Sequence, residues 1–207
     1  MPPPSRYTFS VLPRRETEIK LAIYDLAAIL DKIRTLRPRP LGRVFEQNTL
    51  YDTPSADLRR RGCLLRLRIE TPAPSFSVLA GKRAAIITAK MPAPASARSP
   101  YKQNLETEMP LKKVSDWRSA LAKLGFRPAF RYEKYRSTFL LRGLHLDLDE
   151  TPAGIFLELE GAPRAIDRAA RALGFRRRDY LRLTYWDLYA AECRRRGQHP
   201  RNMLFGS

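Results

Sequence analysis

Residues 14–20 read RRETEIK, with a charged side chain at every second position from the first glutamate onward: Glu16, Glu18 and Lys20. Side chains at alternating positions of a β-strand project to the same side, whereas this spacing gives no continuous stripe on an α-helix. The other face carries apolar residues such as Ile19 and Leu21. Residues 16–23 are therefore predicted to form a strand with one charged face and one apolar face.

The same alternation recurs in six further segments. Each places charged side chains two residues apart between mostly apolar neighbours: Arg66 and Arg68, Lys90 (with Thr88 on its face), Glu106 and Glu108, Lys134 and Arg136, Asp147 and Asp149, and Glu158 and Glu160. One such strand is typical of a sheet with one face in water. Seven together are not, because a merely solvated face would mix serine, threonine and amides among the charges.

Turn and helix signals divide the rest of the chain, since prolines and glycines end the patterned segments. The remaining strands are predicted at 43–52, 63–70, 85–90, 101–109, 130–150 with a turn near Gly143, and 155–160. Helices are predicted at 24–36, 114–124, 163–173 and 179–196, and the likeliest flexible loops at 71–80 and 92–100.

About eight strands joined mostly by short turns favour antiparallel pairing, and about eight strands close into a small barrel. The predicted fold is α+β: an eight-stranded antiparallel β-barrel tunnel with a charged lumen and helices packed outside. The lumen would hold eight acids and six bases. Unpaired buried charges are prohibitively costly, and water, a bound metal and a polyanion would satisfy the charges of such a lumen. The bases would hold phosphate oxygens, and the acids a divalent cation, Mg²⁺ or Mn²⁺, which prefers oxygen ligands.

The composition is that of a globular protein, with 207 residues, 43% hydrophobic and 29% charged, and a net charge of +18. We predict a flexible lead at 1–14 and a single domain at 15–207. The sequence contains no apolar run long enough to predict a membrane-spanning helix. Its N-terminus lacks the apolar core of a secretory signal. The two cysteines are consistent with free thiols in a cytoplasmic protein. No P-loop motif or nucleophile–histidine constellation occurs.

The ordered set of strand motifs resembles the CYTH superfamily, also called triphosphate tunnel metalloenzymes. ETEIK at 16–20 is similar to the family's ExExK signature. Six further segments resemble its later motifs in order: FEQNTLYDTP (45–54), LRRRGCLLRLR (58–68), TAK (88–90), ETE (106–108), EKYR (133–136) and LDETPAGIFLELEG (148–161). ExExK alone is short, whereas seven ordered motifs over about residues 14–205 form a strong signal.

The resemblance implies roles for individual side chains. The triphosphate would be gripped by Lys20, Arg66, Arg68, Lys90 and Arg136. Metal would be bound, directly or through water, by Glu16, Glu18, Asp149, Glu158 and Glu160. Lys134 matches a lysine proposed in some family hydrolases to help activate the attacking water. A second metal site or charge balance is assigned to Glu106, Glu108 and Asp147.

The favoured function is a metal-dependent triphosphatase that hydrolyses inorganic triphosphate or an organic triphosphate. The alternative is a class IV adenylate cyclase, which converts ATP to cyclic AMP and pyrophosphate with the same triphosphate-binding residues. The sequence offers no unambiguous adenine pocket. A third is a non-catalytic module that binds polyphosphate or nucleic acid. The lumen carboxylates argue against it, so the expected partner is a triphosphate-containing small molecule and not nucleic acid. The sequence leaves open whether this protein forms a homodimer, as some relatives do.

Tyr185 lies where the family often has a Ser-Tyr pair, with Thr184 in place of the serine. We interpret it as part of a helix stripe that packs on the barrel: Leu181, Tyr185, Leu188 and Tyr189.

Overall fold

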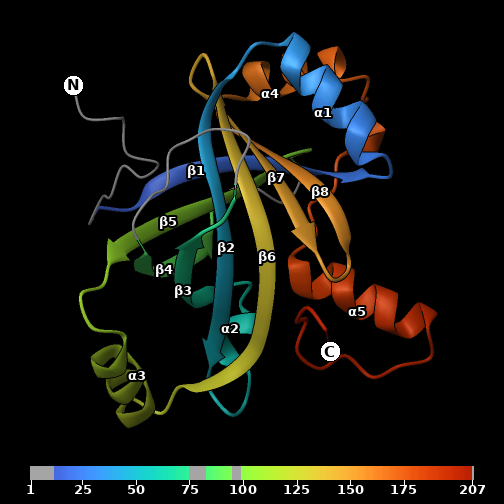
Figure 1. Cartoon of the computed structure of the whole chain (residues 1–207). Helices are drawn as coiled ribbons and strands as arrows, with labels where there is room; N and C mark the ends of the chain where they lie inside the picture. Colours follow the sequence, from blue (N-terminus) through green and yellow to red (C-terminus); the bar gives the residue numbers. More distant parts are fainter. Residues whose placement is uncertain (1–11, 75–82, 95–98, 207) are drawn as a thin grey trace.

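The computed structural model describes residues 12–74, 83–94 and 99–206, and at its centre eight antiparallel strands close into a barrel (Figure 1). The strands are β1 (Arg14–Ile23), β2 (Arg39–Asp52), β3 (Leu64–Pro72), β4 (Ala84–Pro92), β5 (Lys102–Pro110), β6 (Arg127–Leu141), β7 (Leu144–Thr151) and β8 (Gly154–Glu160). Their order around the barrel is β1-β5-β4-β3-β2-β6-β7-β8. The predicted α+β fold with an eight-stranded antiparallel barrel is confirmed.

Two meanders, β2 to β5 and β6 to β8, make up most of the barrel, and three long-range pairings close it. Strand β1 inserts between β5 and β8, so Glu18 lies opposite Lys102 on one side and opposite Glu160 on the other. Strand β2 pairs with β6 along nearly its whole length, from Arg39 opposite Leu140 to Asp52 opposite Arg127. Charged faces from both ends of the sequence therefore enclose one interior.

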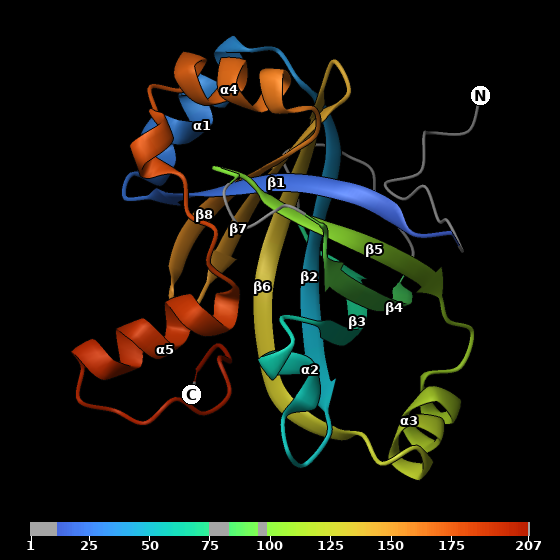
Figure 2. The ribbon, with the colours of Figure 1, turned by 180° about the vertical axis from the view of Figure 1, so that it is seen from behind.

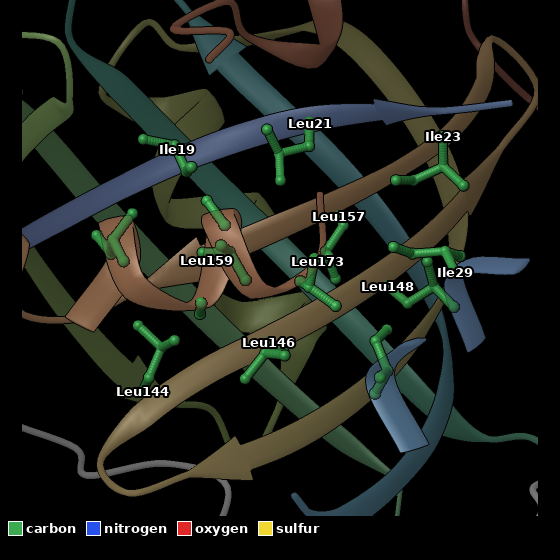
Figure 3. Packing of buried hydrophobic residues seen from close by; sticks show 14 of the residues in the cluster. Ile19, Leu21, Ile23, Ile29, Leu144, Leu146, Leu148, Leu157, Leu159 and Leu173 are labelled. Atoms are coloured by element: carbon green, nitrogen blue, oxygen red, sulfur yellow. The ribbon is translucent and has the colours of Figure 1, made fainter. Parts of the chain in front are cut away.

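The apolar face of β1 points outward and packs beneath helices α1 (Leu26–Thr35) and α4 (Pro163–Ala172). Figure 3 shows this cluster, which includes Ile19, Leu21, Ile23, Ile29, Leu157, Leu159 and Leu173. Helix α1 begins at Leu26 because the Asp25 side chain accepts a hydrogen bond from the backbone N–H of Ala28. A shift of β1 by one residue would turn its apolar side chains into the lumen, so this packing fixes which face points inward.

Further helices of the described chain lie around the barrel: α2 (Asp57–Arg60), α3 (Val114–Lys123) and α5 (Tyr185–Arg195), with a 3₁₀ turn at Arg177–Asp179. Figure 2 shows α2 and α5 in the same half of the molecule as the lower ends of β2 and β6. The start of α5 packs in an aromatic cluster with Phe130, Tyr132 and Phe156. After α5 the chain returns to β6, where Met203 forms a bridge with Tyr132.

Two element boundaries differ from the prediction by four residues or more. Helix α5 begins at Tyr185 and not at 179, because the side chains of Thr184 and Asp187 form a reciprocal capping box. Strand β2 begins at Arg39, before the predicted start at 43. A register shift between Pro40 and Gly42 interrupts the ladder there, which lets the strand accept a proline without an N–H.

Part of the predicted lead and loops lies outside the described residues, namely 1–11, 75–82 and 95–98. Strand β1 begins at Arg14, the last residue of the predicted lead. The described ends of the two predicted loops are partly strand, up to Pro72 and Pro92. Among the helices of the described residues, none has the length and apolarity needed to cross a membrane.

Candidate active site

The barrel encloses a cavity of about 150 Å³ whose lining is dominated by charged side chains. Thirteen of the fourteen predicted lumen residues line it: Glu16, Glu18, Lys20, Arg66, Arg68, Lys90, Glu106, Glu108, Lys134, Arg136, Asp147, Glu158 and Glu160. The fourteenth, Asp149, is fully buried and does not contribute to the lining. A polar cavity of this size has room for several ordered waters or part of an anionic ligand.

On the wall formed by β1, β4 and β5, the β1 glutamates hold lysines. Lys90 Nζ donates to both carboxylate oxygens of Glu16, at 2.6 and 2.8 Å. Lys102 Nζ donates to Glu18 at 2.9 Å. Burial alone would raise the pKa of Glu18, but Lys102 and other nearby lysines lower it to about 2. Glu18 therefore stays ionised and holds its lysine at the cavity surface.

Arg136 of β6 joins the carboxylates of the opposite wall. Its guanidinium donates to Asp149 at 2.7 Å, to Asp147 at 3.0 Å and also to Glu158. Burial alone would lower the pKa of Arg136, but these carboxylates, Asp147 foremost, raise it well above its usual value. Lys20 Nζ lies 2.8 Å from Glu158, so β1 is tied into the same network. Such a network fixes the positions of its members.

Lys134 is fixed by two carboxylates from different strands. Its Nζ donates to Asp149 of β7 at 2.8 Å and lies 3.5 Å from Glu46 of β2. The side chains of both carboxylates are fully buried, so bulk solvent does not reach them, and the ammonium compensates part of their charge. Lys134 is thereby held at one position in the cavity wall.

Two further bases of the site come from β3. Arg66 donates to Thr88 at 3.1 Å and lies 3.4 Å from Glu108. Arg68 donates from Nε to the side-chain oxygen of Asn48 at 3.0 Å. The two arginines therefore have partners on both neighbouring strands, β2 and β4, as well as on β5.

The sequence reasoning missed several charged or polar residues of the interior, among them Arg14, Glu46, Asn48, Glu70 and Lys102. A signal was present for two of them, because Arg14 and Glu70 extend the period-two rows of β1 and β3. In β2 the row consists of one acid and one amide, Glu46 and Asn48. The rule that looked for pairs of charges therefore did not select it.

The interior as a whole is net acidic. Its bases are Arg14, Lys20, Arg66, Arg68, Lys90, Lys102, Lys134 and Arg136. Its acids are Glu16, Glu18, Glu46, Glu70, Glu106, Glu108, Asp147, Asp149, Glu158 and Glu160. Eight bases against ten acids give a formal charge of −2 when every group is ionised, so the excess behind the net charge of +18 lies elsewhere in the chain. A triphosphate would add more negative charge, so this interior needs added cations to bind one.

The donor chemistry of the β1–β8 wall fits a divalent cation. Glu18 and Glu160 lie directly opposite each other, an arrangement of like charges that destabilises a sheet. Burial and the charge of Glu16 raise the pKa of Glu160 to about 8, although Arg14 lies 3.3 Å from it. Carboxylate oxygens are the ligands that Mg²⁺ and Mn²⁺ prefer. Within the part of the chain that the structure describes, no three acidic, histidine or cysteine side chains already converge as a metal site, since the carboxylates are paired with bases.

The raised pKa of Glu160 predicts that the metal-free protein loses stability as the pH rises. A group with a raised folded-state pKa binds its proton more tightly in the folded state, so its contribution is lost between the unfolded value of 4.5 and about 8. Its side chain is 24% exposed, so we expect a loss of about 2 kcal/mol between pH 5 and pH 8.

Urea unfolding in EDTA measures this slope, which should flatten in Glu160→Gln and shrink when Mg²⁺ is added. Glu18 does not contribute in this window, because its pKa of about 2 places its effect at lower pH. A wild-type stability equal at pH 5 and pH 8, or a slope unchanged in the variant, would contradict the assignment.

Tyr185 reaches the charge network as well as packing on the barrel. Its hydroxyl donates to the fully buried Asp149. Its ring lies beneath two ammonium groups, with centroid distances of 4.4 Å to Lys20 Nζ and 4.8 Å to Lys134 Nζ. The interpretation of this residue as packing alone is therefore incomplete, because the period-3.6 stripe does not reveal where its hydroxyl ends.

We expect Tyr185→Phe to lower the free energy of unfolding by about 1.5–3 kcal/mol, the usual contribution of a hydrogen bond to a charged group. Phenylalanine keeps the ring beneath the two lysines and removes only the hydroxyl. Tyr189→Phe on the same helix is the matched control, since its hydroxyl donates to the backbone oxygen of Asn202 at an exposed position, 3.0 Å away. Urea unfolding of both variants checks this, and equal losses would refute a special role for the Asp149 contact.

These features define a closed antiparallel barrel with a buried cavity lined by charges of both signs. The CYTH domain model matches residues 14–176, and the chain belongs to the CYTH family. A search of curated protein sequences gives no match.

Three similar solved structures come from different organisms. One is a proposed adenylate cyclase from Vibrio parahaemolyticus, with a TM-score of 0.69, 20% identity, and 84% of this chain and 97% of that chain covered. A protein of Pyrococcus horikoshii has a TM-score of 0.67 at 23% identity, with 86% of this chain and 99% of that chain covered. A proposed adenylyl cyclase from Hippeastrum is described as having a dominant triphosphatase activity. It has a TM-score of 0.57 at 18% identity, with 89% of this chain and 97% of that chain covered. At these identities the likeness shows the fold.

Proposed function

We propose that this protein is a divalent-metal-dependent triphosphatase that hydrolyses a linear triphosphate, inorganic or organic, inside the barrel. The observation that carries the proposal is the net-acidic interior, in which ten acids hold eight bases around one cavity. A module that only binds polyanions would gain nothing from so many carboxylates. Phosphoryl transfer instead needs fixed cationic groups and a metal, which such carboxylates can hold.

The bases of the cavity would bind the phosphate oxygens: Lys20, Arg66, Arg68, Lys90 and Arg136. Because each is already fixed by a carboxylate or a hydroxyl group, little reorganisation would accompany binding, which favours a preorganised electrostatic site. Lys134, held by Asp149 at 2.8 Å, would orient the attacking water beside the terminal phosphate. No covalent nucleophile is needed for this chemistry.

A divalent cation would be held by the carboxylates of the β1–β8 wall: Glu16, Glu18, Glu158 and Glu160. When bound, it would neutralise charge that develops on the phosphate oxygens. Asp149 is a weaker candidate for a ligand than the sequence suggested, because it is fully buried and already bonded to Lys134, Arg136 and Tyr185. We propose that Asp149 positions these three side chains instead. Glu106, Glu108 and Asp147 remain proposed for a second metal or for charge balance.

The alternative is a class IV adenylate cyclase, in which the ribose 3′-hydroxyl attacks the α-phosphorus and pyrophosphate leaves. The similarity in fold to the Vibrio parahaemolyticus structure, which is described as a proposed adenylate cyclase, supports this alternative. Both reactions would use the same bases and the same cation.

One assay separates these functions. The purified chain is given inorganic triphosphate, ATP or thiamine triphosphate with Mg²⁺ or Mn²⁺, and phosphate, pyrophosphate and cyclic AMP are measured. We expect metal-dependent phosphate release that stops in EDTA. Cyclic AMP and pyrophosphate from ATP would establish the cyclase instead, and tight binding of all three compounds without turnover would refute both.

A further inference from the structure

The part of the chain outside the barrel interior has the opposite charge balance from the interior. Removing the eight bases and ten acids of the interior from the chain's 39 and 21 leaves 31 bases against 11 acids. Lysines and arginines in such excess attract polyanions. The lumen carboxylates disfavour nucleic acid inside the barrel, but they do not face a partner that binds outside it.

Helix α4 gathers part of this excess into one stripe. Arg164, Arg168 and Arg171 are all exposed, and their spacing of four and three residues places them on one side of the helix. The one acid of this helix, Asp167, is buried, and Arg177 donates to it at 2.7 Å. Within the part of the chain that the structure describes, no carboxylate lies within ion-pair distance of the three stripe arginines. Their charges are therefore available to a partner.

A groove of about 430 Å³ lies beside this stripe, between α4, the end of α1 and the turn from β6 to β7. Arg168 lines it from α4, and the exposed Arg142 lines it from the turn. The other described residues of its lining are aliphatic apart from one threonine, so neither an acid nor an aromatic ring contributes. Arg142, Arg164, Arg168 and Arg171 together are called the α4 arginine face below. Figures 1 and 2 show α1 and α4 together at one end of the molecule, away from α5.

The chemistry and spacing of the α4 arginine face fit a row of phosphates. A guanidinium group binds phosphate oxygens through two parallel hydrogen bonds and stays charged at any physiological pH. Arg164 and Arg171 are seven residues apart, which is about 10 Å along the helix axis. One strand of a DNA duplex carries a phosphate about every 3.4 Å along its axis, so the stripe is long enough to face about three phosphates.

Two other polyanionic partners fit this face less well. Proteins that prefer single strands stack the bases on aromatic side chains, and neither the stripe nor the described groove lining offers one. A helix that binds a membrane surface inserts exposed apolar side chains, whereas the large apolar residue of α4, Ile166, is fully buried against the barrel. The outer side of α4 therefore has charge to offer and nothing to insert.

We infer that the α4 arginine face binds the phosphate backbone of double-stranded nucleic acid, independently of base sequence. This inference goes beyond the proposed function and does not depend on it, because the four arginines lie outside the cavity. Since the contacts are to phosphates alone, DNA and RNA duplexes bind with similar affinity. Such binding weakens steeply with salt, because each neutralised phosphate releases a bound counterion.

The salt dependence of binding tests the inference. Fluorescence anisotropy with a labelled DNA duplex of about 20 base pairs gives the binding constant between about 50 and 200 mM KCl. Four phosphate contacts predict a slope of about −3.6 for the logarithm of the binding constant against the logarithm of the salt concentration. In the triple variant Arg164→Gln/Arg168→Gln/Arg171→Gln the slope should shrink by about 2.7, and the affinity at the lowest salt should fall at least about tenfold. Glutamine has a helix propensity close to that of arginine, so α4 should persist, which circular dichroism checks.

A second triple variant separates this face from the net charge of the chain. Arg60→Gln/Arg195→Gln/Arg196→Gln removes the same number of charges from arginines that already pair with Asp57 or Glu192. We expect its slope and affinity to stay close to the wild-type values. Equal losses in the two triple variants would show that net charge alone attracts the duplex, and would overturn the inference.

Further probes decide the place and the class of the partner. Lys20→Met, a variant of the cavity, should bind the duplex as the wild type does, and a loss of binding there would place the nucleic acid in the barrel and overturn the inference. An RNA duplex of the same length should bind with similar affinity, and the single strand no more tightly. Preference of the wild type for the single strand, or for vesicles of phosphatidylserine and phosphatidylcholine at equal phosphate concentration, would also overturn it.

Discussion

Replacing Lys20 with methionine will lower metal-dependent triphosphate turnover about 10²–10³-fold, the usual effect of removing one preorganised charge from a phosphate or oxyanion site. Lys20 is 4% exposed, lines the cavity, and is held between Glu158 at 2.8 Å and the ring of Tyr185. Methionine has a similar length and apolar stem, so it fills the same space without the charge. Glu158 keeps Arg136 as a partner in the variant, so the fold should persist.

Phosphate release under saturating Mg²⁺ and far-UV circular dichroism together check this expectation. Lys123→Met on the surface helix α3 is the control, because it removes a lysine without touching the cavity. Glu18→Gln should likewise abolish the metal-dependent part of the turnover. A folded Lys20→Met protein with wild-type turnover would rule out the barrel interior as the catalytic site.

Asp149→Asn will destabilise the protein by about 3–5 kcal/mol, because it removes one partner from a buried ion pair and leaves the other charges uncompensated. Asp149 is fully buried and receives hydrogen bonds from Lys134, Arg136 and Tyr185. An amide cannot accept from all three donors, because one of its two polar atoms is itself a donor. The loss should appear in the urea midpoint at unchanged m-value.

Asp147→Asn, two residues earlier on the same strand, is the matched control. Burial and the charge of Asp149 raise the pKa of Asp147, so the folded state already disfavours its ionised form. A neutral amide there should cost much less, about 1 kcal/mol. Comparable losses in the two variants would show that Asp149 is not the structural centre of the network.

Much of the fold and of the cavity lining follows from local sequence pattern. Alternation in ETEIK assigns Glu16, Glu18 and Lys20 to one face of a strand, and the structure places all three at the cavity. The same rule works for the other paired rows, because the direction of a strand side chain depends only on its parity. It fails for Glu46, whose row contains an amide instead of a second charge.

The role of Asp149 shows what parity cannot decide. It has the same parity as Asp147, and the sequence suggested it as a metal ligand. In the closed barrel its partners arrive from β6 and α5, and their donors occupy its carboxylate while Asp147 reaches the cavity. Which of two equivalent carboxylates lines the cavity therefore depends on side chains distant in the sequence.

By itself, the sequence determined that this protein is an antiparallel barrel with a charged interior, because the period-two alternation of each strand is a local property. Only the tertiary structure decided how the interior charges pair, and that their formal sum is negative. The physical reason is that these properties arise from barrel closure, which brings β1, β2 and α5 against strands far away in the chain. Electrostatic pairing follows those distances and not the order of residues.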